Sequence, residues 1–345
     1  MGLVKLLKKK NKKILFTTPS HAQKLAIYKP LKSLYKIDFS ETDAHNPLEA
    51  LSKAQERARK IYKTNSTYFL TNGSTSGIIA SVLTCVNPGE KVLIWRDAHP
   101  CHLNAVRLAG AIPIFYDVEI DEQWGVPIET KPEMIENYLN AYEAKALIIT
   151  SPTYEGIVSD IRKIKKICER HNVYLIVDEA HGALYPFSDR LPESALNIAD
   201  FTVQSLHKTA GGLNPTALLH CSCNLRADRA LSMINTTSPS YPILASIEEN
   251  IKFLNSWWGK RKLDLLLDEL EMLQDECPNC EFFGDDITKI LIKVPELSGE
   301  ELSEILFDEY NIEDEKTNEK STMLLCGIGT EKNKIRKLKK ALQNL

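Results

Sequence analysis

The sequence predicts an α/β fold with a mainly parallel central sheet in a large domain, followed by a smaller α/β domain. From residue 66 onward, short β-branched runs alternate with helical segments, and several of these runs are apolar on successive residues. Such alternation is typical of parallel sheets covered by helices, and continuous apolar runs are typical of strands buried on both faces. A second, shorter alternation of strands and helices follows a long helical stretch.

Side-chain periodicity gives the range of each expected element. Strands are predicted at 68–70, 91–95, 112–116, 146–150, 174–177, 201–204 and 217–220, and helices between them at 76–86, 102–109, 131–142 and 159–171. A helical stretch over 241–275 leads to a strand–helix–strand–helix unit at 287–294, 299–307, 321–327 and 331–345. We therefore expect an N-terminal arm over 1–45, a large domain over 46–260 and a small C-terminal domain over 261–345.

Composition narrows the classes of function. The chain has 345 residues, of which 43% are hydrophobic and 26% charged, enough for a large core. Lys and Arg total 43 against 46 Asp and Glu, so the net charge of −3 gives no general attraction to nucleic acid. No apolar run approaches the roughly 20 residues of a membrane helix. A soluble enzyme acting on a small molecule, without a nucleic-acid or membrane partner, is the expected class.

The first residues and the cysteines bear on location and on metal binding. Residues 1–13 contain six lysines around apolar residues, which predicts a short basic amphipathic helix packed on the body or on a partner subunit, and not a secretory signal. Eight cysteines without such a signal indicate reduced thiols and a cytoplasmic protein. A zinc site would require the pair Cys221 and Cys223 to meet Cys277 and Cys280. We expect no metal, because the two pairs stand in different predicted elements.

Four polar clusters stand where predicted strands end, and ligands bind at the carboxyl ends of strands in open parallel sheets. The first cluster, residues 72–77, follows a strand and opens a helix. Its glycines allow close approach to the backbone, and its hydroxyl residues Ser74, Thr75 and Ser76 stand at a helix N-terminus, where a phosphate is favoured. An ordinary serine-rich helix cap is the alternative.

The second and third clusters contain one acid and one amine. Asp178 ends the apolar strand 174–177, and a carboxylate there is costly unless a cationic group meets it. Lys208 follows the next strand, close to the hydroxyls of Ser205 and Thr209 and to His207. A desolvated amine at such a point can form an imine with a carbonyl compound. A capping aspartate and a solvated lysine are the ordinary alternatives.

The fourth cluster contains His99, after the strand 91–95, where a histidine is more often a hydrogen-bonding residue than a catalyst. Together the clusters suggest one ligand. A phosphate would lie at 74–76, a protonated ring nitrogen opposite Asp178, an aldehyde at Lys208 and a flat ring against His99. Pyridoxal phosphate combines these four features.

The motifs then resemble a known family, the pyridoxal-phosphate-dependent ornithine/lysine/arginine decarboxylases of the aspartate-aminotransferase fold (fold type I), in a compact form without the large extra domains. Five motifs stand in the order and approximate spacing of that family, namely residues 72–77, 151–154, 177–182, 205–208 and 237–241. The resemblance covers roughly residues 16–345. One such motif would be weak, but five in order make coincidence an unlikely explanation.

The resemblance implies a role for each matching residue. Lys208 would hold pyridoxal phosphate as a Schiff base, and Asp178 would keep its ring nitrogen protonated. His99 would stack on the ring, with Ala180 and His181 along its other face and edge. The phosphate would be held by Ser74, Thr75, Ser205 and His207. Residues near Ser238 and Ser240 would approach the neighbouring subunit's cofactor, which implies a homodimer or a higher homo-oligomer.

The chain departs from the family pattern near its start. Relatives read Thr-Pro-Gly-His-Lys-Gly in a loop beside the active-site mouth, whereas residues 18–23 here read Thr-Pro-Ser-His-Ala-Gln. His21 is therefore a candidate substrate-binding residue. The segment 212–217 after Lys208 also differs from the family.

We expect decarboxylation of an amino acid, most specifically lysine, arginine or ornithine, which releases carbon dioxide and an amine of polyamine biosynthesis. Lys208, Asp178, His99 and His207 are the expected catalytic residues, with Lys208 or His207 returning a proton to Cα. A distal cation on the substrate needs a carboxylate partner, and Glu155 is one candidate. An exposed glutamate that leads a helix is the ordinary alternative for Glu155.

Other functions remain open on the sequence. The same cofactor could support aminotransfer, β-elimination or another carbanion reaction, because fold and cofactor do not decide which bond breaks. A non-catalytic homologue that binds a partner is less favoured, since it has no use for Lys208, Asp178 and the phosphate loop together. The lysine-rich start leaves a nucleic-acid binder as a third possibility.

Overall fold

The computed structural model describes residues 2–10, 29, 32–38 and 49–345. Its main sheet has seven strands in the order β1-β9-β8-β7-β6-β2-β3. The strands span Ser66–Leu70 (β1), Lys91–Trp95 (β2), Ile112–Tyr116 (β3), Ala144–Thr150 (β6), Tyr174–Asp178 (β7), Phe201–Ser205 (β8) and Ala217–Cys221 (β9). From β8 to β3 every neighbouring pair is parallel, whereas β9 is antiparallel to both β1 and β8. The predicted mainly parallel sheet is confirmed.

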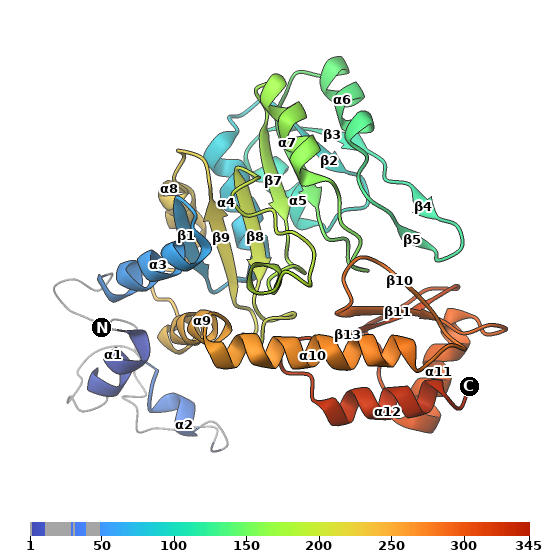
Figure 1. The fold of residues 1–345 in the computed structure, drawn as a ribbon. Helices are drawn as coiled ribbons and strands as arrows, with labels where there is room; N and C mark the ends of the chain where they lie inside the picture. The colour runs from blue at the N-terminus through green and yellow to red at the C-terminus, as the bar shows by residue number, and fades with distance from the viewer. Residues whose placement is uncertain (1, 11–28, 30–31, 39–48) are drawn as a thin grey trace.

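Helices cover both faces of this sheet (Figure 1). One face carries α4 (Gly73–Cys85), α5 (Cys101–Leu108) and α8 (Asp228–Ile234), and the other carries α6 (Pro132–Ala141) and α7 (Ile161–Arg170). Alternate residues of one strand enter different cores, because Ile176 packs against the α4 side and Leu175 against the α7 side. This double burial accounts for the continuous apolar strands in the sequence.

The C-terminal unit is a four-stranded antiparallel sheet, in the order β10-β11-β13-β12, with two helices. Its elements are β10 (Glu281–Phe283), β11 (Lys289–Lys293), α11 (Gly299–Tyr310), β12 (Lys316–Thr317), β13 (Thr322–Leu325) and α12 (Lys332–Leu342). The predicted strand–helix–strand–helix order is present. The edge strands β10 and β12 were not predicted, because three and two residues are too few to show a periodicity. The hairpin strands β4 (Ile120–Asp121) and β5 (Val126–Pro127) are equally short.

The single long helix expected over 241–275 is wrong, since two helices occupy that range. They are α9 (Tyr241–Leu254) and α10 (Trp257–Asp275). Ser256 begins α10 as its N-cap, with its Oγ accepting a hydrogen bond from the Gly259 N–H at 3.1 Å. In Figure 1, α10 lies alongside α12 of the C-terminal unit, with which it packs. The predicted domain boundary at 260–261 falls within α10 and stays a prediction.

The basic helix predicted at the start of the chain is present as α1 (Leu3–Lys10). It packs on α9 and on α3 (Glu49–Tyr62), burying Leu3 and Leu7, while the Leu3 N–H donates to the buried Glu248 at 2.6 Å. The short helix α2 (Lys32–Tyr35) follows. The predicted segment 18–23, with His21, lies outside the described residues.

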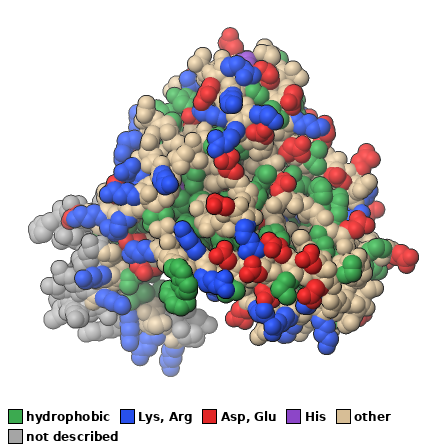
Figure 2. All heavy atoms as spheres, viewed as in Figure 1, with side chains coloured by type: hydrophobic (Ala, Val, Ile, Leu, Met, Phe, Trp, Pro, Cys, Tyr) green, Lys and Arg blue, Asp and Glu red, His purple; other side chains and the backbone are tan. Residues whose placement is uncertain are grey.

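Two further features of the described residues concern the charge of the surface and the character of the helices. Lys and Arg side chains are interspersed with Asp and Glu on the face drawn in Figure 2, in keeping with the nearly balanced charge of the chain. Among the described helices, none combines the length and the apolar character that crossing a bilayer requires.

Candidate active site

A cavity of about 480 Å³ lies at the carboxyl ends of the parallel strands. It is lined by Trp95, Thr150 and Asp178, which end β2, β6 and β7. Most of the predicted site residues share this wall: Ser74, Thr75, His99, Glu155, Asp178, Ala180, His181, His207 and Lys208. The fold therefore gathers residues that are more than 130 positions apart in the sequence, from Ser74 to Lys208.

Two predicted residues are not at the cavity wall. The Ser76 hydroxyl is buried and donates to the Gly73 carbonyl at 2.8 Å within the first turn of α4, so this hydroxyl is already paired inside the helix. Ser205 is fully buried at the end of β8, and its Oγ has no hydrogen-bond partner among the described residues.

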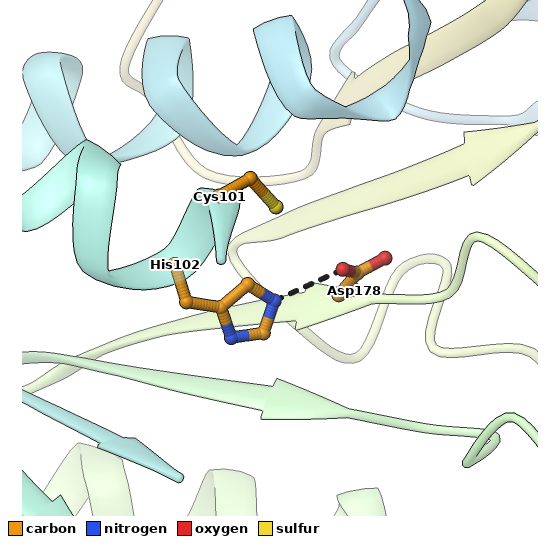
Figure 3. Close-up of side chains that lie close together, drawn as sticks. All are labelled: Cys101, His102 and Asp178. Carbon is orange, nitrogen blue, oxygen red and sulfur yellow. Dashed lines mark hydrogen bonds and ion pairs between the residues drawn. The ribbon is translucent and has the colours of Figure 1, made fainter. Parts of the chain in front are cut away.

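Asp178 carries a buried carboxylate whose two oxygens both accept hydrogen bonds. Oδ2 accepts from His102 Nε2 at 2.9 Å (Figure 3), and Oδ1 accepts from the Ala180 N–H at 3.1 Å. Burial opposes ionisation of this carboxyl, yet the His102 hydrogen bond and the charge of Lys208 bring the pKa of Asp178 below its ordinary value. Asp178 is therefore a fixed negative charge in the cavity wall.

Lys208 is mostly buried, and its Nζ lies 2.8 Å from His181 Nε2. Burial lowers the pKa of Lys208 and outweighs the opposing effect of Asp178, and the nearby Lys289 charge adds to the lowering. Burial, together with the Lys208 and Lys289 charges, holds the pKa of His181 well below its ordinary value. Burial and the Lys289 charge therefore favour the unprotonated, nucleophilic form of Lys208 more than water would.

The start of α4 supplies the predicted phosphate-binding features. Gly73 has a φ of +72°, a conformation that side chains disfavour, and its N–H donates to the Pro215 carbonyl at 2.9 Å. Ser74 and Thr75 follow in the first turn of a 13-residue helix, where free N–H groups favour an anion. The His207 ring is fixed from the other side by a hydrogen bond from Nδ1 to the Thr216 carbonyl at 2.9 Å.

His99 stands at the turn that opens α5. Its Nδ1 accepts a hydrogen bond from the Cys101 N–H at 3.2 Å. Burial lowers its pKa, and this outweighs the opposite effect of Asp178. The lowered pKa favours the neutral form of the ring.

Glu155 is not the exposed, helix-leading residue of the ordinary alternative. It lies in a turn, its side chain is 1% exposed, and its Oε1 accepts from Lys316 Nζ at 2.5 Å. Its Oε2 has no partner among the described residues. The neighbouring Tyr154 packs on the His181 ring, with centroids 4.5 Å apart, and its hydroxyl donates to Glu315. Residues of the C-terminal unit thus close one side of the cavity.

Cys101, His102 and Asp178 form the one group of candidate metal ligands found within the described ranges, and Figure 3 shows how the three side chains lie close together. Burial raises the pKa of the Cys101 thiol well above its usual range, so it is a poor metal ligand. His102 Nε2 is already hydrogen-bonded to Asp178. We therefore interpret the group as support for the Asp178 carboxylate.

Sequence reasoning missed His102, Tyr154 and Lys316. His102 stands three residues after His99, so the turn that opens α5 brings both histidines near the cavity, and this spacing was the available signal. Tyr154 belonged to a quoted motif but was given no role. No local pattern marked Lys316, which reaches the cavity from β12.

Comparison with known proteins gives a family match over most of the chain. The model described as "Orn/Lys/Arg decarboxylase, major domain" matches residues 10–296. The uncharacterized protein YaaO of Bacillus subtilis is 32% identical over 340 residues, which cover 91% of this chain and 71% of that protein. An arginine decarboxylase of Halalkalibacterium halodurans is 30% identical over 325 residues, which cover 88% of this chain and 66% of that protein.

A solved structure shows the same fold. The lysine decarboxylase LdcF of Francisella novicida matches with a TM-score of 0.85 and 20% sequence identity, over 99% of this chain and 59% of that chain. The present chain thus spans less than two thirds of the length of both the arginine decarboxylase and LdcF. These matches confirm the resemblance drawn from the five motifs and the predicted fold class. This chain belongs to the Orn/Lys/Arg decarboxylase family, whose members depend on pyridoxal phosphate.

Proposed function

We propose that this protein decarboxylates an amino acid with pyridoxal phosphate as its cofactor, and that the substrate is a basic amino acid. One observation carries the proposal: a buried lysine with a lowered pKa and a buried, ionised aspartate line the same cavity. Relatives named arginine decarboxylase and ornithine decarboxylase support the reaction and the substrate class.

The cavity residues fit pyridoxal phosphate in charge. The Lys208 amine would bind the aldehyde, and the Asp178 carboxylate would face the ring nitrogen. Ser74 and Thr75 at the start of α4 would hold the phosphate, joined by His207. Ser205 is a further proposed phosphate ligand, because its buried hydroxyl has no hydrogen-bond partner among the described residues.

His99, Ala180 and His181 would enclose the cofactor ring. His99 presents a neutral imidazole from one element, and Ala180 and His181 approach from the segment after β7. When bound, pyridoxal phosphate supplies a ring that accepts the electron pair left by the departing carboxylate. Asp178, ionised and hydrogen-bonded on both oxygens, would stabilise the positive ring nitrogen throughout this process.

Two residues of the cavity can return a proton to Cα of the substrate. Lys208 has a partly desolvated amine, and His207 has a ring that its bond to Thr216 holds in place. A positioned acid of either kind typically contributes about 10²–10⁴-fold to rate. We propose Lys208 or His207 for this step.

Glu155 is the proposed partner of the distal cation of the substrate. Its buried Oε2 lacks a hydrogen-bond donor, which is costly unless a ligand supplies one. An ammonium or guanidinium group on the substrate would supply it. Lys316, which is half-exposed and bonded to Oε1, balances part of the Glu155 charge in the free protein.

We also propose a cytoplasmic homodimer or higher homo-oligomer that forms an amine for polyamine biosynthesis. The family resemblance supports the assembly, through the motif near Ser238 and Ser240. The free thiols of all eight cysteines accord with a reducing compartment.

Reaction of the apoprotein with pyridoxal phosphate should depend on pH through Lys208. Only the neutral amine attacks an aldehyde, and burial lowers the pKa of Lys208 below 10.5, so the attachment rate should rise with pH to a plateau whose midpoint lies below 10.5. Stopped-flow absorbance measures this rate, with N-acetyl-lysine as the matched free amine. A midpoint equal to that of N-acetyl-lysine would contradict the lowered pKa.

Incubation of the holoenzyme with arginine, lysine and ornithine separately should yield carbon dioxide and the corresponding amine from at least one of them. Lys208→Ala should lower this rate by a hundredfold or more, on the order expected for loss of a positioned acid or base. Product chromatography and carbon dioxide release provide the measurement. Keto acid without carbon dioxide would reject decarboxylation, and protein that stays colourless with pyridoxal phosphate would favour a non-catalytic homologue.

Glu155→Gln should weaken selection for a positively charged side chain. Losing a charged hydrogen-bond partner costs about 1.5–3 kcal/mol, so we expect kcat/KM for the preferred basic amino acid to fall roughly tenfold to a hundredfold. The rate with norleucine, an uncharged relative of lysine, should not fall in parallel. Lys316→Gln is the matched control, because it keeps the carboxylate. Equal losses for charged and uncharged substrates in Glu155→Gln would count against this role.

A further inference from the structure

A buried ion pair lies directly behind the cavity wall. Lys289 and Asp286 have fully buried side chains, with Nζ and Oδ2 2.6 Å apart. Lys289 begins β11 of the C-terminal unit, and Asp286 stands in the turn before it. Neither residue lines the cavity.

All three protons of the Lys289 ammonium are donated in hydrogen bonds. Besides Asp286, Nζ donates to the His181 backbone carbonyl at 2.7 Å and to Thr288 Oγ1 at 3.2 Å. Asp286 is equally saturated, since Oδ1 accepts from the Thr288 N–H and hydroxyl and Oδ2 also accepts from the Tyr185 hydroxyl at 2.9 Å. The pair therefore joins the C-terminal unit to the segment 181–185 of the large domain.

The His181 carbonyl matters because of where the His181 side chain lies. Its Nε2 is 2.8 Å from Lys208 Nζ, and its ring packs on Tyr154. Its Nδ1 has no hydrogen-bond partner among the described residues. The ring is thus not fixed by a bond at its second nitrogen, and its position depends on packing and on the backbone that Lys289 anchors.

The backbone beside this pair also contacts the turn that carries Glu155. The Gly156 carbonyl accepts from the Asp285 and Asp286 N–H groups at 3.2 and 3.1 Å. Gly156 has a φ of +93°, and a Cβ there would lie 3.0 Å from Lys289 Cβ. The Lys289 ammonium thus bonds the wall at His181, while the backbone beside Asp286 bonds the turn of Glu155.

Stability alone gives a weak reason for such a pair. Removing two charges from water is costly, and apolar replacements of similar volume are often neutral or stabilising. What an apolar pair could not supply is the hydrogen bond from Nζ to the His181 carbonyl. That bond is the specific contribution of Lys289.

We propose that Lys289 is a positioning residue, whose ammonium, oriented by Asp286, fixes the His181 backbone and so holds the imidazole against the Lys208 amine. The inference rests on the proposed role of Lys208. Four cationic or basic side chains surround His181, namely Lys208, Lys289, His207 and Lys316, while Asp178, Cys101 and Glu315 face Lys208. A test must therefore separate a change of position from a change of charge.

The double variant Lys289→Met/Asp286→Asn removes one positive and one negative charge together, so its direct electrostatic effect is small. A matched control is Lys293→Met/Glu281→Gln, which neutralises another Lys–carboxylate pair, in which Lys293 of β11 lies 4.0 Å from Glu281 of β10 and neither residue lines the cavity. Each holoenzyme is titrated with pH while the visible absorbance of bound pyridoxal phosphate is recorded. The value of kcat/KM and urea unfolding are measured in parallel.

The Lys289 and Asp286 double variant should shift the absorbance midpoint by about half a pH unit or more and lower kcat/KM roughly tenfold, because the groups around Lys208 lose their alignment. The Lys293→Met/Glu281→Gln control should match the wild type in the absorbance midpoint and in kcat/KM. A second variant, Lys289→Met/Asp286→Leu, replaces the first one if the amide introduced by Asp286→Asn destabilises the buried site. It should show the same two changes.

Three results decide the matter. A folded variant with wild-type midpoint and kcat/KM would overturn the positioning role. Loss of folding in both Lys289 variants, with the control folded, would also overturn it, since Lys289 would then be a structural residue. A wild-type protein without absorbance from bound pyridoxal phosphate would instead reject the proposed function, which distinguishes the two failures.

Discussion

The site depends on a carboxylate that stays ionised while almost fully buried. Asp178 ends a strand that is covered on both faces, where an unpaired charge would be expelled or protonated. The hydrogen bonds from His102 and from the Ala180 N–H replace the lost water and keep its pKa low. A permanent negative charge at this point gives the cavity its polarity, and the proposed chemistry needs that charge.

The parallel sheet brings further polar residues to the same edge as Asp178. Because β6, β7 and β8 run in the same direction, the residues that follow them meet at one edge, and Lys208 comes to share a wall with Asp178. The C-terminal unit completes the cavity with Lys316 and, behind the wall, with Lys289. Most of the cavity wall thus comes from residues of the main sheet and its connections, and the C-terminal unit adds Lys316 to it.

Local sequence predicted the strands of the main sheet, the helices between them and half of the residues that line the cavity, because buried parallel strands are continuously apolar and polar residues follow them directly. It could not predict the partner of Asp178, since His102 is 76 positions away and meets it only through the packing of α5 on the sheet. Lys316 was missed for the same reason. The break at Ser256 was missed because α9 and α10 have similar apolar spacing, although the cap was visible in the sequence.

The central claim is that Asp178 holds a protonated nitrogen in the cavity. Nitrogen-15 NMR of the holoenzyme with isotope-labelled pyridoxal phosphate measures this directly through the chemical shift of the ring nitrogen. The account predicts a protonated ring nitrogen near neutral pH in the wild type and an unprotonated one in Asp178→Ala. An unprotonated nitrogen in the wild type, or a protonated one in both proteins, would contradict it.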